Sequence, residues 1–417
     1  MTDDGRQPHA DTTSGFEMLK LRPAHVVVFK ERSERNARRI SDTLGARWSA
    51  QKNLRPSIDL LMPHKDDLPH TRVYHRLGVA VGSFHPEQLD KLRKHEHVAV
   101  VEPNHVRRLP PVRYAQSITD SVPAEGSSPE ALTWCLTAIG LAADGSEPTG
   151  AGVKVAVLDT GLDLTHPDFD GRVETVNTRG FVPGVQGVQD DNGHGTHCSG
   201  IAAGPLLPHG GGARFGVAPG ATLIIGKVLD KHESGTDDHI LDGIDWAVDQ
   251  GARVISMSLG SPRDENAAYS KAYETIAASV AQDGTLIVGA AGNDSERNSF
   301  RRPVNNPAAC PSILAVAALD RFNGITPFSA ATLDTIGQVD IGAPGDGVVS
   351  TWLGGKYRAS SGTSMAAPHV VGVAALLLEL HPTLTVIELA DMLRSIAVGV
   401  GLDASDTGAG LAQCPAP

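Results

Sequence analysis

The feature that most limits the fold is a series of short apolar runs in the chain after Trp134. The runs lie at residues 153–158, 223–228, 254–257, 286–290 and 313–317. They are continuous rather than alternating, which is typical of strands that are covered on both faces. Amphipathic stretches at 238–250 and 267–281 lie between several of these runs. This alternation predicts an α/β fold, a doubly wound and mostly parallel sheet with helices on both faces.

A smaller unit precedes this sheet. Apolar or β-rich runs at 26–29, 72–81 and 98–102 predict strands. Helices are expected at 33–44 and from Pro86 onward, because proline suits the first turn of a helix. The pattern predicts a compact α+β unit in which two helices cover one face of an antiparallel sheet.

Two segments show no periodic pattern. Residues 1–23 are polar and acidic, and they are expected to form a disordered leader. Residues 109–132 contain several Pro, Gly and Ser residues, and they are expected to form a linker. Cleavage concentrates in exposed mobile segments, so we expect the chain to be cut within this linker.

The charge of the chain is unevenly spread. The 417 residues carry a net charge of −12, which argues against a general nucleic-acid binder because such proteins need a basic patch. Residues 24–109 hold 16 basic and 10 acidic side chains, whereas residues 110–417 hold 17 and 34. These balances predict two domains that attract one another, and two unrelated solvated surfaces are the alternative. The longest apolar run, near 370–378, is too short to span a bilayer, so no membrane partner is expected.

The cysteines and the N-terminus bear on the compartment. The four cysteines, Cys135, Cys198, Cys310 and Cys414, lack metal-ligand spacing, so no structural zinc site is expected. One disulfide bond is compatible with this number, but the sequence does not choose its partners. The first 23 residues hold no apolar segment of the kind found in secretory signals, which favours a cytoplasmic location.

Three short segments carry residues that could perform chemistry. Asp159 ends a predicted buried strand, His194 stands among glycines before a helical stretch, and Ser364 precedes an apolar helix. Taken singly, they are explained as a turn residue, an exposed histidine and a helix cap. Together they supply the carboxylate, the imidazole and the hydroxyl that nucleophilic acyl transfer needs.

The sequences around these three residues match one known family. They read Val-Ala-Val-Leu-Asp-Thr-Gly at 155–161, Asn-Gly-His-Gly-Thr-His at 192–197 and Ser-Gly-Thr-Ser-Met-Ala-Ala-Pro at 361–368. About residues 134–411 resemble the subtilisin-like serine proteases, or subtilases, nearest to the proteinase K branch. The resemblance implies that Asp159 orients the base, His194 is the general base and Ser364 is the nucleophile.

The N-terminal unit resembles the inhibitory propeptide of the same family. The resemblance implies a ferredoxin-like propeptide domain at 24–108, which guides folding and then occupies the active site. It also implies a self-cleaved linker at 109–132 and a subtilisin-like catalytic domain at 133–417. Family members of this kind are secreted, in contrast to the location that the first 23 residues favour.

The resemblance also indicates which residues meet the substrate. Asn293 follows the predicted strand at 286–290 and matches the donor that stabilises the oxyanion, with the backbone N–H of Ser364 as the second donor. Positions that match substrate-binding residues are Ser258, Leu259, Gly260, Ala291 and Gly292. The first three match a strand edge that pairs with an extended peptide, and the small residues leave room for a pocket. We expect a preference for medium to large apolar residues before the scissile bond.

A structural calcium ion is also implied by the family. Its ligands would be the carboxylate of Asp340 and the main-chain carbonyls of Pro311 and Ile313. A strand-end aspartate without a metal is the alternative. Catalysis itself is expected to need no cofactor. Cys198 resembles a free thiol that the proteinase K branch keeps beneath its histidine, and His197 is expected to be structural.

These residues together predict a serine endopeptidase. It would hydrolyse peptide bonds through an acyl-enzyme and would be made as an autoinhibited, self-processing precursor. The expected partners are peptide or protein substrates and its own propeptide, without nucleic acid or membrane, and the enzyme is expected to be a monomer. A narrow-specificity cytoplasmic processing protease or peptide ligase would share this chemistry. A binding module without catalysis is the third interpretation, which the complete set of Asp159, His194, Asn293 and Ser364 disfavours.

Overall fold

The fold is known from a computed structural model that describes residues 24–32, 39, 71–122, 131–142 and 148–415. The predicted leader at 1–23 and nearly all of the helix expected at 33–44 lie outside the described residues. All four cysteines lie in described parts of the chain, and none of them forms a disulfide bond.

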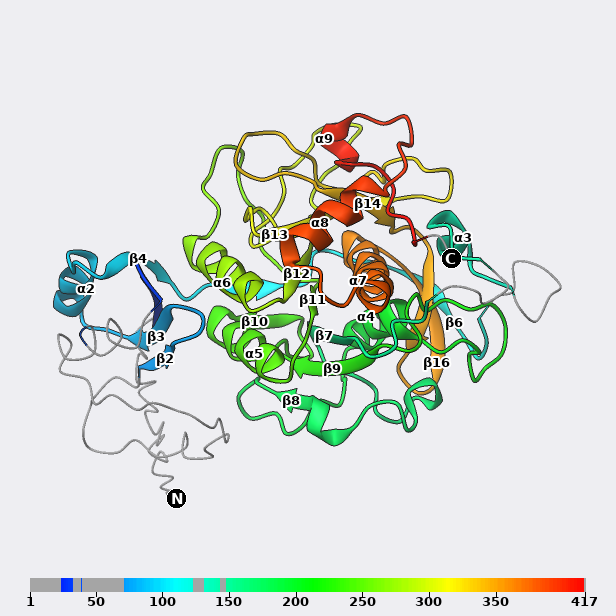
Figure 1. The fold of residues 1–417 in the computed structure, drawn as a ribbon, viewed down its shortest axis with the longest axis horizontal. Helices are drawn as coiled ribbons and strands as arrows, with labels where there is room; N and C mark the ends of the chain where they lie inside the picture. The colour runs from blue at the N-terminus through cyan, green and yellow to red at the C-terminus, as the bar shows by residue number, and fades with distance from the viewer. Residues whose placement is uncertain (1–23, 33–38, 40–70, 123–130, 143–147, 416–417) are drawn as a thin grey trace, which may run out of the picture.

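A seven-stranded parallel sheet forms the centre of the larger part of the molecule (Figure 1). Its strands, in spatial order, are β14 (Ile341–Pro344), β13 (Ile313–Leu319), β12 (Leu286–Ala290), β11 (Val254–Met257), β7 (Lys154–Asp159), β9 (Thr222–Lys227) and β8 (Thr178–Gly180). The five predicted apolar runs are all strands of this sheet, which confirms the α/β prediction. Strands β8 and β14, which are only three and four residues long, were not predicted.

Helices cover both faces of the sheet. On one face lie α4 (His194–Ala203) and α7 (Thr363–Leu380), and on the other lie α5 (Asp237–Asp249) and α6 (Lys271–Gln282). Strand β7 illustrates how one strand contributes to both apolar layers, because alternate side chains of a strand point to opposite faces of the sheet. Val155 and Val157 pack in the cluster with α4 and α7, whereas Ala156 and Leu158 pack in the cluster with α5 and α6.

The long helix α7 belongs to the core. By length and composition it could cross a membrane, but 89% of it is buried inside the protein, as in the core helix of a globular domain. The shorter elements are α3 (Trp134–Ala138), α8 (Val386–Ser395), α9 (Ala404–Thr407) and the 3₁₀ turns η2 (Pro167–Phe169) and η3 (Thr175–Asn177).

The N-terminal unit is a four-stranded antiparallel sheet in the order β2-β3-β1-β4. The elements are β1 (Ala24–Phe29), β2 (Arg72–Tyr74), β3 (Val79–Ser83), α2 (Pro86–Arg93) and β4 (Val98–Pro103). One face of the sheet, including Val27, packs on α2. The other face, including Val26 and Val28, packs against residues of α5 and α6 in one continuous apolar cluster. Figure 1 shows this unit beside those two helices.

Ion pairs surround this apolar contact, which is called the docking face below. Arg32 binds Asp283 at 2.8 Å. The Arg76 guanidinium pairs with Asp249 and also lies 3.7 Å from Asp283. On the other side, Arg72 pairs with Asp242, which also accepts a hydrogen bond from the Tyr74 hydroxyl at 2.8 Å. The basic side chains of the N-terminal unit therefore meet acidic side chains of α5 and Asp283, which directly follows α6, as the charge distribution predicts.

The segment expected to be a linker is partly a strand. Residues Arg113–Thr119 form β6, which pairs with β16 (Lys356–Ser361) in a sheet that also contains β15 (Val348–Trp352). The expectation of a structureless linker is wrong for these residues. The strand was missed because it lies at the edge of a small sheet, where most of its side chains stay half or fully exposed and no apolar alternation is needed.

Candidate active site

The three candidate catalytic residues come from three different elements. Asp159 is the last residue of β7, His194 is the first residue of α4, and Ser364 is the second residue of α7. Asp159 and His194 are both buried, and Asp159 Oδ1 lies 2.8 Å from His194 Nδ1. The carboxylate therefore fixes the histidine tautomer that keeps the proton on Nδ1 and leaves Nε2 free to accept one.

Glycines allow α4 to start this close to the end of β7. Gly193 precedes the helix with φ of 107°, and a Cβ there would lie 2.7 Å from the Trp352 ring. A Cβ on Gly195 would lie 2.3 Å from the carbonyl oxygen of Gly161. Any side chain at either position would push His194 away from Asp159.

Asp190 holds the first turn of α4. Its carboxylate accepts hydrogen bonds of 2.9 Å from the backbone N–H groups of Gly193 and Thr196. These donors have no partner within the helix, so the carboxylate satisfies them. Its negative charge also interacts favourably with the positive end of the helix dipole. Asp190 was not predicted from the sequence, although an acidic residue just before a glycine-rich helix start is a signal that could have identified it.

The surroundings of His194 favour its charged form. Burial opposes the charge, but the attraction of Asp159 outweighs it and holds the pKa of His194 well above its usual 6.5. The Cys198 thiol lies 3.8 Å from His194 Nδ1, and burial raises the pKa of this thiol. The thiol therefore stays protonated beneath the histidine. By contrast, burial lowers the pKa of the neighbouring His197 to about 3, so His197 is neutral and structural, as expected.

Ser364 is fully buried at the start of α7. Its Oγ has no hydrogen-bond partner among the described residues, and the same holds for His194 Nε2. The Cys198 thiol connects the two residues, because its sulfur lies 3.4 Å from the Ser364 carbonyl oxygen as well as close to the histidine ring. The Ser364 hydroxyl and His194 Nε2 are thus both buried and both without a hydrogen-bond partner among the described residues.

Pro368 explains why side chains from other elements hold Ser364. In a regular helix the N–H of residue 368 would bind the carbonyl of residue 364, but proline has no N–H. The Ser364 carbonyl instead accepts hydrogen bonds from Ser258 Oγ at 3.0 Å and from the Cys198 thiol. Ser258, expected at the substrate, therefore supports the backbone of Ser364 from the end of β11.

A second buried serine lies near the histidine along the chain. Ser199 follows Cys198 in α4, and its Oγ also has no hydrogen-bond partner in the described part of the chain. It is five residues from His194, which turns its side chain about 140° around the helix axis. Ser199 therefore faces away from the imidazole, whereas Ser364 contacts the same thiol as the imidazole does.

Asn293 lies just beyond the end of β12 and is held by α7. Its Oδ1 accepts hydrogen bonds of 2.8 Å from both the N–H and the hydroxyl of Thr363. This fixes the amide so that Nδ2 points the other way, and Nδ2 donates to the carbonyl oxygen of Pro111 at 3.0 Å. Thr363 was not recognised from the sequence, although it directly precedes Ser364.

The chain itself occupies the strand edges beside the site. Strand β5 (Val106–Arg108) pairs antiparallel with β10 (Ser234–Thr236). On its other side, Arg108 and Gly260 exchange backbone hydrogen bonds of 2.8 and 2.9 Å. Residues 106–112, called the cleft segment below, thus run as an added strand between β10 and Gly260 and reach Asn293 at Pro111. Among the other expected substrate residues, Leu259 and Ala291 are buried in apolar clusters, and Gly292 donates its N–H to the Thr363 hydroxyl.

The residues expected to bind calcium do not fit a cation. One carboxylate oxygen of Asp340 accepts a hydrogen bond from Arg394 at 2.8 Å, and the other accepts one from the N–H of Ala315 at 2.7 Å. The Arg394 guanidinium already supplies a positive charge beside this carboxylate, and each of its two oxygens already accepts a hydrogen bond. Calcium at this place stays a prediction, and the contacts of Asp340 argue against it.

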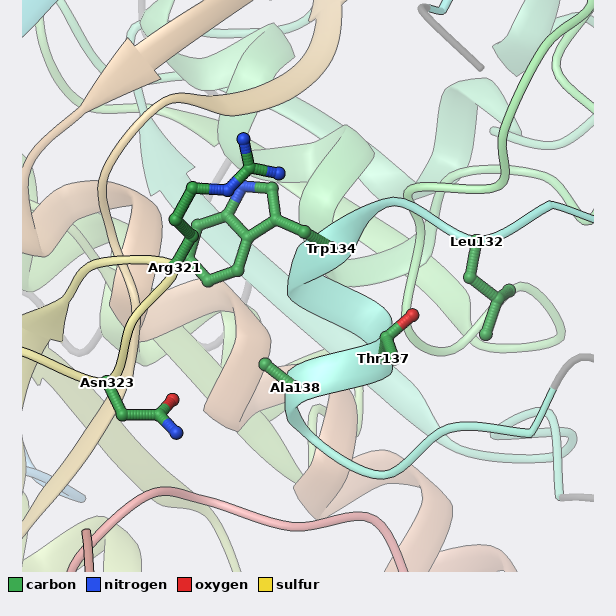
Figure 2. Close-up of a pocket in the computed structure, with 6 residues that line it drawn as sticks. All are labelled: Leu132, Trp134, Thr137, Ala138, Arg321 and Asn323. Atoms are coloured by element: carbon green, nitrogen blue, oxygen red, sulfur yellow. The ribbon is translucent and has the colours of Figure 1, made fainter. Parts of the chain in front are cut away.

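A surface pocket lies apart from these residues. It is lined by Leu132, Trp134, Thr137, Ala138, Arg321 and Asn323 (Figure 2). The α3 residues and the turn after β13 form its walls, and none of the expected site residues lines it.

The sequence is similar to those of known proteins. Residues 150–410 match the model of the subtilase family. The chain is 37% identical over 329 residues to subtilisin E of Bacillus subtilis, an alignment that covers 78% of this chain and 77% of that protein. It is 41% identical over 257 residues to subtilisin of Bacillus pumilus, covering 61% and 86%, and 38% identical over 239 residues to an intracellular serine protease of Paenibacillus polymyxa, covering 56% and 69%.

A solved structure has a similar fold. The keratinolytic enzyme fervidolysin of Fervidobacterium pennivorans, which is related to subtilisin, superposes with a TM-score of 0.70 at 24% identity. The match covers 94% of this chain, which spans 60% of the length of fervidolysin.

Proposed function

The chain belongs to the subtilase family of serine endopeptidases, and from this premise we propose that Ser364 is its nucleophile, His194 its general base and Asp159 the carboxylate that orients the base. In this proposal His194 Nε2 takes the proton of Ser364 Oγ as the oxygen attacks the substrate carbonyl carbon. The imidazolium that forms keeps its proton on Nδ1 and donates it in a hydrogen bond to Asp159 Oδ1, 2.8 Å away. The same proton then passes to the leaving amine, and water hydrolyses the acyl-enzyme by the reverse sequence.

The hydrogen bond of Asn293 is the observation that supports this proposal most strongly. Its Nδ2 already donates to a peptide carbonyl, that of Pro111, at 3.0 Å. A peptide carbonyl bound there gains negative charge as Ser364 attacks it, and a fixed donor stabilises this charge. The N–H of Ser364, in the first turn of α7 where backbone N–H groups lack helical partners, would supply the second donor.

The protein is also proposed to be made as an autoinhibited precursor. The cleft segment lies where an extended substrate would lie, and its Pro111 carbonyl lies at the proposed oxyanion donor. The last backbone N–H of the segment that donates to a strand edge is that of Leu109, which binds the carbonyl oxygen of Glu233 at 3.2 Å. The next two residues, Pro110 and Pro111, have no N–H to donate. The segment would therefore hold the site occupied and be cut slowly, at the bond between Pro111 and Val112.

Two measurements test this function. A fluorophosphonate should label Ser364 in the wild-type protein, and the labelled residue can be located by peptide mass spectrometry. The purified wild-type chain should gain a new N-terminus at Val112, whereas the Ser364→Ala chain should stay intact. Labelling at another serine, or equal cleavage of both chains, would overturn the assignment.

A further inference from the structure

The cleft segment places an arginine in a buried acidic pocket. Arg107 is 3% exposed, although the residues on either side of it, Val106 and Arg108, are exposed. Because alternate side chains of a strand point to opposite sides, residue 107 is the one that points into the body of the protein. A buried charge at such a position needs a partner to compensate for its lost hydration.

Asp237 is that partner. Arg107 Nε donates to Asp237 Oδ1 at 2.6 Å, and Nη2 donates to Oδ2 at 3.3 Å, so the guanidinium binds the carboxylate with two donors. The side chains of both residues are 4% exposed. Ser261 Oγ accepts a third hydrogen bond from Arg107 Nη1 at 2.6 Å, and the guanidinium carbon lies 5.2 Å from the centre of the Tyr273 ring.

The pocket belongs to the larger domain and not to the cleft segment. Asp237 is the first residue of α5, where the helix dipole favours a negative charge, and the Tyr273 hydroxyl of α6 donates to its Oδ1 at 3.0 Å. When the cleft segment leaves, these groups remain beside the strand edges formed by Gly235 and Gly260. The same two edges would bind a substrate, so the substrate residue that pairs with Gly235 would point at Asp237.

We propose that Asp237, with Ser261 and Tyr273, forms a specificity pocket that selects substrates carrying arginine at the residue paired with Gly235. This inference rests on the proposed function, because it assigns the side-chain preference of the same cleft. Arginine fits better than lysine, since only a guanidinium offers two parallel donors and a flat face to the ring. An apolar residue would leave the buried carboxylate without a countercharge, although the Tyr273 hydroxyl would still donate to it.

The position of this arginine in a substrate follows from the strand pairing. Arg107 pairs with Gly235, and four residues later Pro111 places its carbonyl at Asn293. A substrate without two prolines can continue the strand further, so the arginine falls at the fourth or fifth residue before the scissile bond. It is thus distinct from the residue directly before that bond, for which an apolar preference is expected.

The test uses enzyme prepared from the full chain and a set of fluorogenic peptides. Each peptide carries arginine, lysine, citrulline or leucine at the fourth or the fifth residue before the cleaved bond. Citrulline keeps the shape of arginine without its charge. At one of the two positions, kcat/KM for the arginine peptide should exceed that for the citrulline peptide by about tenfold to a hundredfold. In Asp237→Asn this ratio should fall to about one. In the control Asp264→Asn, which removes a carboxylate that is 94% exposed, the ratio should stay unchanged.

Two further variants test the inference even if the Asp237→Asn chain does not fold or does not cleave itself. The double variant Arg107→Leu/Asp237→Leu replaces the ion pair by an apolar pair, and its preference should change from arginine to leucine. The inactive chain Ser364→Ala/Arg107→Leu, whose own segment has lost the ion pair, can be titrated with labelled peptides of residues 104–112. The peptide with arginine at 107 should bind at least about tenfold more tightly than the one with citrulline.

The outcomes separate this inference from the proposed function. Equal cleavage of arginine and citrulline peptides at both positions, or equal binding to the inactive chain, overturns the arginine pocket even if Ser364 is labelled and casein is digested. Absence of labelling and of casein digestion overturns the proposed function, and the binding titration still decides whether the pocket selects arginine.

Discussion

The N-terminal part of the chain contacts the larger domain in two places, the docking face and the cleft segment, which differ in their physics. The docking face combines an apolar sheet with ion pairs such as Arg76–Asp249, whose side chains are 32% and 48% exposed. The cleft segment uses backbone hydrogen bonds and one ion pair, Arg107–Asp237, that is nearly free of solvent. Exposed ion pairs are screened by salt and tolerate changes of geometry, whereas a buried pair with backbone ladders on both sides fixes one register. The first contact thus supplies attachment, and the second supplies position.

Removal of the proposed nucleophile should have the largest effect while it leaves both contacts in place. Ser364→Ala should lower kcat on the order of 10⁶-fold, a magnitude known for subtilisin, because the oxygen that attacks the substrate is gone. The intact chain should accumulate with the cleft segment bound. Electrophoresis of the purified protein and hydrolysis of casein measure both effects. Processing of this variant at the wild-type rate would show that another protease cuts the chain.

Removal of the amide of Asn293 should disturb the end of the cleft segment and the chemistry together. Asn293→Ala should lower kcat by about 10²- to 10³-fold with little change in KM, as for the corresponding donor in subtilisin. Self-cleavage should slow by a similar factor, because the same amide binds the Pro111 carbonyl. Steady-state kinetics and a time course of processing provide the measurement. A rise in KM with an unchanged kcat would assign Asn293 to substrate binding alone.

The pH dependence should reflect the buried pair at the centre of the site. His194 accepts a proton only when neutral, and the attraction of Asp159 holds the pKa of His194 well above 6.5. The value of kcat/KM should therefore fall about tenfold per pH unit below that raised pKa. The charged pair stabilises the fold fully below pH 6.5 and loses this contribution as the pH rises through the raised pKa. The midpoint of the activity profile should therefore lie above 6.5 and change little between low and high salt, because the pair is buried. A midpoint at or below 6.5 in the pH–rate profile would contradict this role of Asp159.

The smallest effect is expected at the docking face. Arg76→Gln in the Ser364→Ala chain should weaken attachment by about 1 kcal/mol or less, because the arginine is partly exposed. Hydrogen exchange of β1–β4 should speed up by several fold at low salt, and the difference from the parent chain should shrink in 1 M NaCl. Arg93→Gln, in an exposed pair within α2, is the matched control and should leave exchange at the docking face unchanged. A difference that persists at high salt would mean that Arg76 acts mainly through packing.

The sequence predicted the parts of the molecule that follow local patterns. The five apolar strands were identified because a strand covered on both faces must be apolar throughout, as β7 is from Val155 to Leu158. The set Asp159, His194 and Ser364 was identified because each lies at the end of a strand or the start of a helix with distinctive neighbours. The structure places these residues in contact through Cys198 and the Asp159–His194 pair.

What could not be predicted depends on partners far away in the chain. The burial of Arg107 depends on Asp237, 130 residues later, and a charged residue in a polar stretch is ordinarily exposed. The contact of Pro111 with Asn293 depends on the register of β5 against β10, which no local pattern specifies. Strand β6 was missed for the same reason, since its pairing with β16 does not require buried side chains.

Strand β6 also affects how far a self-cleavage could proceed. Arg113 pairs with Ser361, three residues before the proposed nucleophile, and the strand continues to Thr119. If the bond after Pro111 breaks, the new amine of Val112 would stay tethered beside the acyl-enzyme by these hydrogen bonds. A tethered amine acts at an effective concentration far above that of a free peptide, so re-formation of the bond would compete with hydrolysis. In the proposed autoinhibited precursor, the cut would then become permanent only when β6 separates from β16. Strand departure, rather than bond breaking, would be the step that commits the chain to its active form.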